Sequence, residues 1–137
     1  MAKLRHIAVA TKDPEKTSEF YKKHFEMEVA GRIENDLAEG YYLSDKVVCL
    51  AILRFKTPNS NRAWDSETFT GIHHFGFIVD DVEKSASDLE ADGSELAADR
   101  YEGRGEDTVF YELKYTAPDD VVLDISERGW VGANAEV

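Results

Sequence analysis

The sequence predicts an α+β fold built from two similar βαβββ modules in tandem. The first observation is an internal repeat: residues 5–16 read RHIAVATKDPEK and residues 73–84 read HHFGFIVDDVEK. In register, His6 aligns with His74, Asp13 with Asp81 and Lys16 with Lys84. The second observation is that each repeat is followed by the same order of predicted elements. A repeat of about half the chain indicates two modules of one architecture.

The first module is predicted over about residues 3–56. Residues 4–11 alternate as a strand does, with His6, Ala8 and Ala10 on one face. Asp13 is a typical helix N-cap and Pro14 a typical first helical residue, so a helix is expected to run to about residue 25. Strands are then expected at 26–33, 41–43 and 47–55.

The second module, about residues 71–130, repeats this order after a polar linker at about 57–70 that contains Pro and Gly. A strand is expected at 72–79, followed by a helix that Asp81 caps and that ends near Gly93. Further strands are expected at 95–100, 108–115 and 121–127. Together the modules form a single domain over residues 1–137.

Composition narrows the possible partners. The 137 residues include 16 Lys and Arg against 28 Asp and Glu, a net charge of −12, which argues against nucleic acid and anionic membranes. The single Cys49 lies in the apolar run VVCLAI and is expected to be a small buried hydrophobe. The N-terminal residues MAKLR lack the apolar stretch of a signal peptide, and a cytoplasmic protein is expected.

Two histidines and one carboxylate form a candidate metal site. His6 and His74 hold equivalent positions in the repeat, each with small residues beside it on the same strand face. Asp124 lies in the middle of the last apolar strand, where a carboxylate facing a dry core is unfavourable. A divalent metal would relieve that cost, and such a triad can hold Fe(II), Zn, Mn or Ni. His73 falls on the opposite strand face, so it is expected to face the helices or the surface and to leave metal content unchanged when replaced.

Other residues have two readings each. Glu112 and Lys114 share a strand face and are candidates for proton transfer or for anchoring an anionic substrate, or they form a solvated cross-strand ion pair. Arg104, between two glycines, is a candidate ligand for a substrate carboxylate or an ordinary loop arginine. Tyr41, Tyr42 and Trp64 line a pocket or pack in the core. Each histidine, taken alone, is also compatible with a purely structural role.

The repeat and these positions resemble the vicinal oxygen chelate superfamily, which includes glyoxalase I, type I extradiol dioxygenases, methylmalonyl-CoA epimerase and bleomycin-resistance proteins. The resemblance covers roughly residues 3–130 and implies curved sheets around a shared cavity. It places His6, His74 and Asp124 at three of the family's ligand positions, for one divalent metal ion. The ending YTAPDDVVLD over residues 115–124 departs from the family pattern at Ala117 and Asp120, and has Asp124 where Glu is usual.

The resemblance leaves three functions open. The last strand of the first module, VVCLAIL, offers only apolar residues at the fourth ligand position, as in extradiol dioxygenases, so a dioxygenase-like oxidoreductase is narrowly favoured. A glyoxalase I-like lyase or an epimerase or isomerase is the second reading. The third is a non-catalytic protein that binds a drug or metabolite without metal. The implied partner is a small molecule with vicinal oxygens, and a homodimer is expected because members of the superfamily often dimerise.

Overall fold

The computed structural model describes residues 1–56, 68–102 and 109–137, and it confirms the α+β fold with two βαβββ modules. The predicted linker lies largely outside the described residues. The elements are β1 (Lys3–Ala10), α1 (Pro14–Phe25), β2 (Glu28–Glu34), β3 (Ala38–Ser44), β4 (Cys49–Phe55), β5 (Gly71–Ile78), α2 (Val82–Ala91), β6 (Leu96–Glu102), β7 (Val109–Thr116) and β8 (Val122–Ser126). Neither helix in these ranges has the length and hydrophobicity that a membrane span requires.

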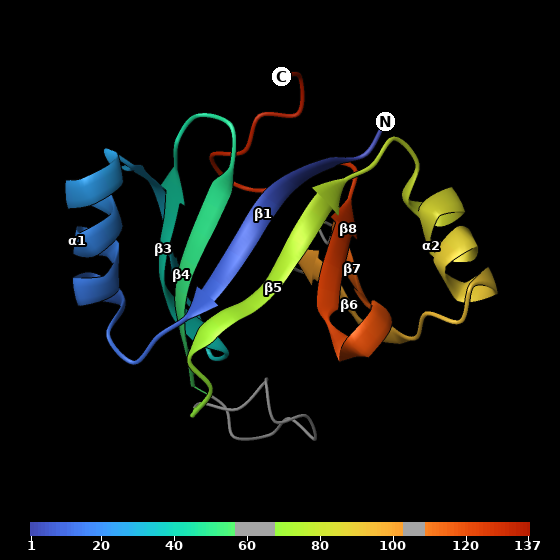
Figure 1. The fold of residues 1–137 in the computed structure, drawn as a ribbon, viewed down its shortest axis with the longest axis horizontal. Coiled ribbons are helices and arrows are strands. Elements are labelled where there is room, and N and C mark those ends of the chain that lie inside the picture. Colours follow the sequence, from blue (N-terminus) through green and yellow to red (C-terminus); the bar gives the residue numbers. More distant parts are fainter. Residues whose placement is uncertain (57–67, 103–108) are drawn as a thin grey trace.

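The two modules of one chain share a single eight-stranded sheet, in the order β2-β3-β4-β1-β5-β8-β7-β6. Figure 1 shows β1 and β5 crossing the middle of the molecule, with α1 and α2 at opposite ends. These central strands are the two copies of the repeat, and they pair antiparallel around Ile7 and Phe75. The candidate ligands on the two first strands therefore lie near the pseudo-twofold axis that relates the modules.

The helices cover one face of the sheet and are capped as the sequence predicts. Asp13 accepts a hydrogen bond from the Lys16 amide at 3.0 Å, and Asp81 accepts one from the Lys84 amide at 2.9 Å. Apolar residues of β7 and β8 pack under α2, in a cluster that contains Val82, Tyr115, Leu123 and Ile125. Apolar residues of β3 and β4 pack under α1, in a cluster that contains Tyr21, Leu43, Leu50 and Ile52. The opposite face, here called the inner face, carries His6, Ala8, Ala51, His74 and Asp124.

Each central strand contains one extra residue immediately before its candidate ligand. In β1, Leu4 pairs with Phe77 and His6 with Gly76, so Arg5 has no opposite residue. In β5, His74 pairs with Ala8 and Ile72 with Val9, so His73 has no opposite residue. Such β-bulges re-aim side chains that strict alternation would place on the other face. The expectation that His73 faces the helices or the surface is therefore wrong. His73 is 7% exposed and lies against His74.

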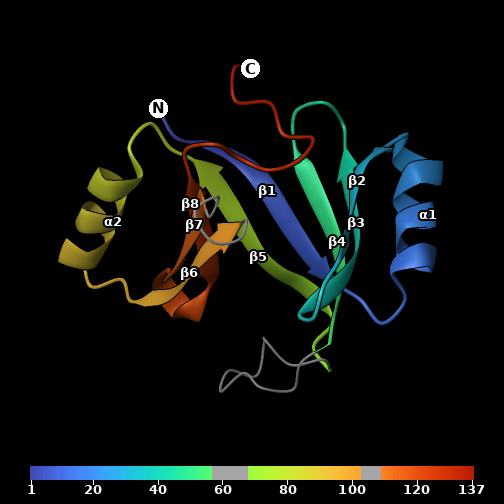
Figure 2. The same ribbon diagram turned by 180° about the vertical axis from the view of Figure 1, so that it is seen from behind.

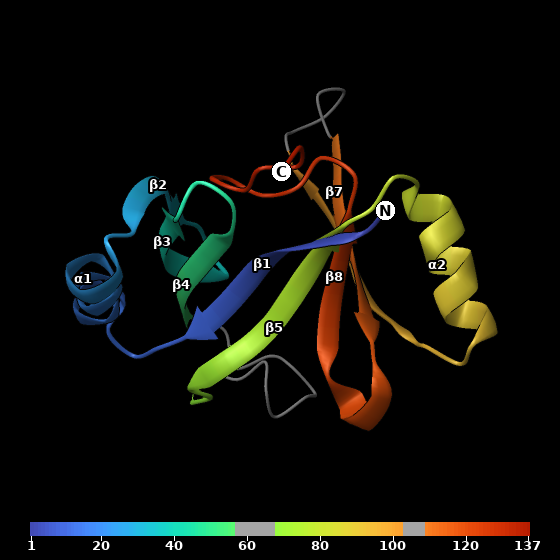
Figure 3. The ribbon, with the colours of Figure 1, turned by 45° about the horizontal axis from the view of Figure 1, so that its top comes forward.

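The chain after β8 returns across the molecule to the first module. Figures 2 and 3 show this C-terminal segment running from β8 toward β3 and β4. The Ser44 hydroxyl donates to the Gly132 carbonyl at 2.7 Å, and the Asn134 amide donates to the Val47 carbonyl at 3.0 Å. The segment also places Trp130 on the inner face, where it packs against Cys49 and Ile78. It thereby connects the two modules next to the candidate ligands.

Candidate metal centre

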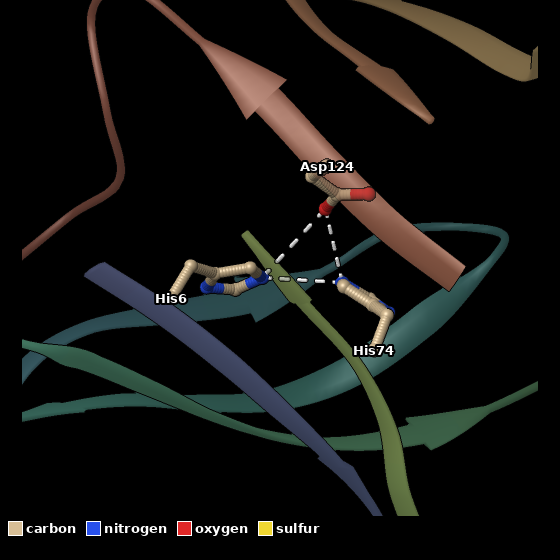
Figure 4. A group of neighbouring side chains, drawn as sticks. All are labelled: His6, His74 and Asp124. Atoms are coloured by element: carbon tan, nitrogen blue, oxygen red, sulfur yellow. Dashed lines mark hydrogen bonds and ion pairs between the residues drawn. The ribbon is translucent and has the colours of Figure 1, made fainter. Parts of the chain in front are cut away.

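Three buried side chains from three strands converge on the inner face. His6 from β1, His74 from β5 and Asp124 from β8 are 3%, 6% and 0% exposed. The two Nε2 atoms lie 3.1 Å apart, and Asp124 Oδ2 lies 3.1 Å from His74 Nε2 and 3.9 Å from His6 Nε2. Figure 4 shows the three side chains pointing toward one another. The sheet register brings them together, because Asp124 pairs with Gly76, two residues beyond His74.

This donor set fits a divalent metal ion. Metal–nitrogen and metal–oxygen bonds of about 2.0–2.2 Å place neighbouring ligand atoms roughly 3.0–3.5 Å apart, close to the spacings found here. Two imidazoles and one carboxylate are the ligand types that Fe(II), Zn, Mn and Ni share. The acidic and basic residues around the candidate ligands are Asp124, Glu112 and Lys114, whose formal charges sum to −1. That charge favours a cation.

The fourth ligand position is apolar, as the sequence predicts. Ala8 pairs with Ala51 in the first module as Gly76 pairs with Asp124 in the second. Ala51 is fully buried and lines the same cavity as His6 and His74. Among the described residues, the first module therefore contributes only His6 to the candidate ligand set.

Lys114 and Glu112 extend the cluster along β7. The Lys114 ammonium lies 2.8 and 2.9 Å from the two oxygens of Asp124 and 3.4 Å from Glu112 Oε1. The other oxygen of Glu112, which is almost fully buried, accepts a hydrogen bond from Trp130 Nε1 at 2.7 Å. Lys114 is thus an ion-pair partner of both carboxylates, and both it and Glu112 face the cavity.

Trp130 occupies much of the space that the small strand residues leave. Its ring stacks on His6 with 4.7 Å between centroids and an interplanar angle of 10°. A Cβ atom on Gly76 would lie 2.7 Å from the Trp130 ring, so only glycine fits there without movement. The space beside Gly76 is therefore not open to a bound molecule. That room is filled by the chain's own tryptophan.

A cavity of about 140 Å³ opens beside the candidate ligands. Its walls are mostly apolar side chains of the first module, and its polar groups come chiefly from the second. The apolar lining comprises Ile33, Leu37, Ala38, Ala51, Leu53 and Phe55. This cavity accommodates a small molecule that has an apolar part and a polar end at the ligands.

The structure separates the residues expected to bind substrate. Tyr42 lines the cavity, whereas the Tyr41 hydroxyl donates a hydrogen bond to Glu15 of α1, on the helix-covered side of the sheet. Tyr41 therefore does not contact the cavity. Arg104 and Trp64 lie outside the described residues. Cys49 is fully buried, and burial raises the pKa of its thiol to about 12, in agreement with a small hydrophobe rather than a nucleophile.

Sequence reasoning assigned no role to Trp130 and the wrong face to His73. The signal for Trp130 lies in its neighbours, because Gly129 and Gly132 both adopt positive φ and turn the chain back over the sheet. The signal for His73 is the doubled histidine itself, since a bulge can place two consecutive side chains on one face.

Burial keeps His6 neutral. Desolvation, followed by the charge on His74, lowers the pKa of His6 from 6.5 to about 3. A neutral imidazole is the form that binds a metal. His6 Nδ1 is buried and has no hydrogen-bond partner within the described part of the chain.

This burial predicts acid sensitivity of the metal-free protein. The unfolded chain protonates His6 near pH 6.5 and the folded protein only near pH 3, so the unfolded state binds more protons between these values. The stability that neutral His6 contributes is complete above pH 6.5 and is lost as the pH falls toward 3, by up to about 5 kcal/mol. Urea unfolding in EDTA at several pH values should show the free energy of unfolding falling with pH in this range. The His6→Gln variant should show a weaker dependence on pH, and an equal dependence in both proteins would refute the assignment.

A model of the Glyoxalase/Bleomycin resistance protein/Dioxygenase superfamily matches residues 3–125 of the chain. The chain belongs to this superfamily. The match spans both modules and all three candidate ligands. No curated protein matches the chain significantly.

Solved structures of the vicinal oxygen chelate superfamily share the fold. A Streptomyces coelicolor methylmalonyl-CoA epimerase variant in complex with 2-nitronate-propionyl-CoA is 24% identical, with a TM-score of 0.69 over 90% of this chain and 94% of that one. Methylmalonyl-CoA epimerase from Mycobacterium tuberculosis is 18% identical, with a TM-score of 0.66 over 90% and 85%. A hypothetical protein from Bacillus halodurans C-125 is 18% identical, with a TM-score of 0.70 over 91% and 93%. At these identities the comparisons show the fold.

Proposed function

We propose that this protein is a metal-dependent enzyme that transfers a proton at a carbon next to a substrate carbonyl, as an isomerase, epimerase or glyoxalase-type lyase does. The observation that carries the proposal is that Glu112 and Lys114 line one cavity with His6 and His74, while the Lys114 ammonium contacts both oxygens of Asp124. A proton-transferring group beside a metal-ligand set is the minimum that such a reaction needs. Several structures of similar fold are methylmalonyl-CoA epimerases, which supports this reading over an oxygenase.

His6, His74 and Asp124 would hold the metal, which supplies a Lewis acid that polarises the substrate carbonyl and stabilises negative charge on its oxygen. Glu112 has the role of base in this proposal. Its Oε1 atom, the oxygen that faces Lys114, accepts the proton from the substrate carbon. The Lys114 ammonium, which is part-exposed, stabilises an anionic oxygen of the substrate. The apolar wall around Leu53 and Phe55 excludes water from the reacting carbon.

The ionisable groups are distributed unequally between the modules. Among the described residues that line the cavity, the carboxylate Glu112 and the lysine Lys114 both come from β7 of the second module. In the first module, the apolar Ala51 stands at the position equivalent to that of Asp124. We infer that removal and return of the proton occur on the side of the second module. A base on one side returns the proton to the face from which it came, so this arrangement favours an isomerase or a glyoxalase-type lyase over an epimerase, which must return the proton to the opposite face.

Proton exchange with solvent tests the proposal. Methylmalonyl-CoA and the hemithioacetal of methylglyoxal with a thiol are incubated with metal-loaded protein in D₂O, and NMR follows the hydrogen next to the carbonyl. We expect deuterium incorporation that EDTA abolishes. Exchange that persists undiminished in EDTA, or no exchange with any carbonyl substrate of these classes, contradicts the proposal.

One observation favours a second candidate. The ligand set of two histidines and one carboxylate, with Ala51 at the fourth position, is the one found in non-haem Fe(II) oxygenases. An extradiol-dioxygenase-like protein loaded with Fe(II) should consume O₂ in the presence of catechols, which a proton-transfer enzyme does not. A non-catalytic binding protein would show neither activity and would keep its ligand affinity in EDTA.

A further inference from the structure

His73 and His74 form a pair of imidazoles that ends at the candidate metal ligands. His73 Nδ1 lies 2.7 Å from His74 Nδ1, and both rings are buried. The other nitrogen of His74, Nε2, lies 3.1 Å from Asp124 Oδ2 and 3.1 Å from His6 Nε2. The two nitrogens of His74 therefore have separate partners. One faces the ligand set and the other faces His73.

This contact constrains where the protons lie. A neutral imidazole that binds a metal through Nε2 carries its proton on Nδ1. The Nδ1–H group of His74 is then directed at His73 Nδ1, which must accept the hydrogen bond, so His73 carries its own proton on Nε2. We propose that His73 is a positioning residue that holds His74 in the tautomer and orientation required for metal binding. This inference rests on the metal site of the proposed function.

The local structure holds His73 in place for this role. The β-bulge in β5 turns its side chain onto the inner face, beside His74. Its ring stacks on Phe55 with 4.5 Å between centroids and meets Phe69 edge-on at 5.8 Å. Metal-bound histidines usually donate to a carboxylate or a backbone carbonyl. An imidazole acceptor adds no further negative charge to a site that already contains Asp124 and Glu112.

The two candidate histidine ligands are supported differently. His74 has the His73 ring at its Nδ1 atom, whereas His6 Nδ1 has no hydrogen-bond partner within the described residues and its ring is held by stacking on Trp130. The bulged residue of the first module, Arg5, instead donates to the Asn134 carbonyl of the C-terminal segment at 2.8 Å. The support of His74 is thus specific to the second module.

A matched pair of variants separates hydrogen bonding from packing. His73→Phe keeps an aromatic ring to stack on Phe55 but has no acceptor, and His73→Asn places a carbonyl oxygen near the position of Nδ1. Calorimetric titration of untagged protein with Zn and Mn is expected to show a loss of about 10- to 100-fold in affinity for His73→Phe. His73→Asn is expected to stay within about 3-fold of the parent protein, since it retains an acceptor.

Nitrogen-15 NMR of the Zn-loaded protein gives a second readout, with the proton of His74 expected on Nδ1 and that of His73 on Nε2. Unchanged affinity in His73→Phe overturns the inference, and an equal loss in both variants reduces His73 to a packing role and also overturns it. A parent protein that binds no metal refutes the inference and the proposed function together. Metal binding with the expected variant pattern but no deuterium exchange refutes the proposed function alone.

Discussion

Asp124→Asn is expected to weaken metal binding by more than about 100-fold, beyond the loss typical of outer-shell partners. The substitution keeps the size of the side chain but removes the only carboxylate among the three candidate ligands. It also removes the charge of one of the two carboxylates that pair with the Lys114 ammonium beside the imidazoles. Elemental analysis and calorimetry of untagged protein, reloaded with Fe(II), Zn, Mn or Ni, measure the effect.

Asp120→Asn is the matched control, because Asp120 is an exposed aspartate in the turn just before β8. It should bind metal as the parent protein does. Circular dichroism should show that Asp124→Asn remains folded, since asparagine has nearly the same size and shape as aspartate. If Asp124→Asn holds metal as tightly as Asp120→Asn, the ligand assignment is wrong.

Glu112→Gln is expected to lower the rate of proton exchange by about 10²- to 10⁴-fold while metal content stays unchanged. Glutamine is similar in size, and its carbonyl oxygen can still accept the hydrogen bond from Trp130. Lys114 keeps its contacts with both oxygens of Asp124, so the rest of the cluster has no reason to move. The substitution therefore removes the base and little else. Deuterium incorporation into a substrate at saturating concentration, followed by NMR, measures kcat directly.

Glu95→Gln serves as the control, since Glu95 is exposed and lies just before the edge strand β6. Its exchange rate should match that of the parent protein. A Glu112→Gln variant with full activity would remove Glu112 from the mechanism and leave Lys114 as the remaining candidate for proton transfer. A variant that loses its metal instead would show that Glu112 supports the ligand set.

The sequence alone determined the architecture and predicted the three candidate ligands. Periodicity and the Asp13 and Asp81 caps are local properties, so the elements followed from short stretches of chain. The repeat that aligns His6 with His74 also determined the centre of the sheet, because equivalent strands pair about the pseudo-twofold axis. Strand alternation correctly placed Glu112 and Lys114 on one face of their strand, and the regular pairing of β7 with β8 brings Lys114 opposite Asp124.

Only the tertiary structure decided what surrounds these positions. His73 reached the inner face because the pairing of β1 with β5 contains a bulge, and a bulge depends on two strands rather than on one. Trp130 reached His6 because the C-terminal segment crosses to the first module, a long-range contact that no local pattern encodes. Tyr42 lines the cavity and Tyr41 does not, because the register of β3 against its neighbours decides which of two adjacent residues faces inward. Local physics fixes which elements form, whereas the register between distant strands fixes which side chains meet.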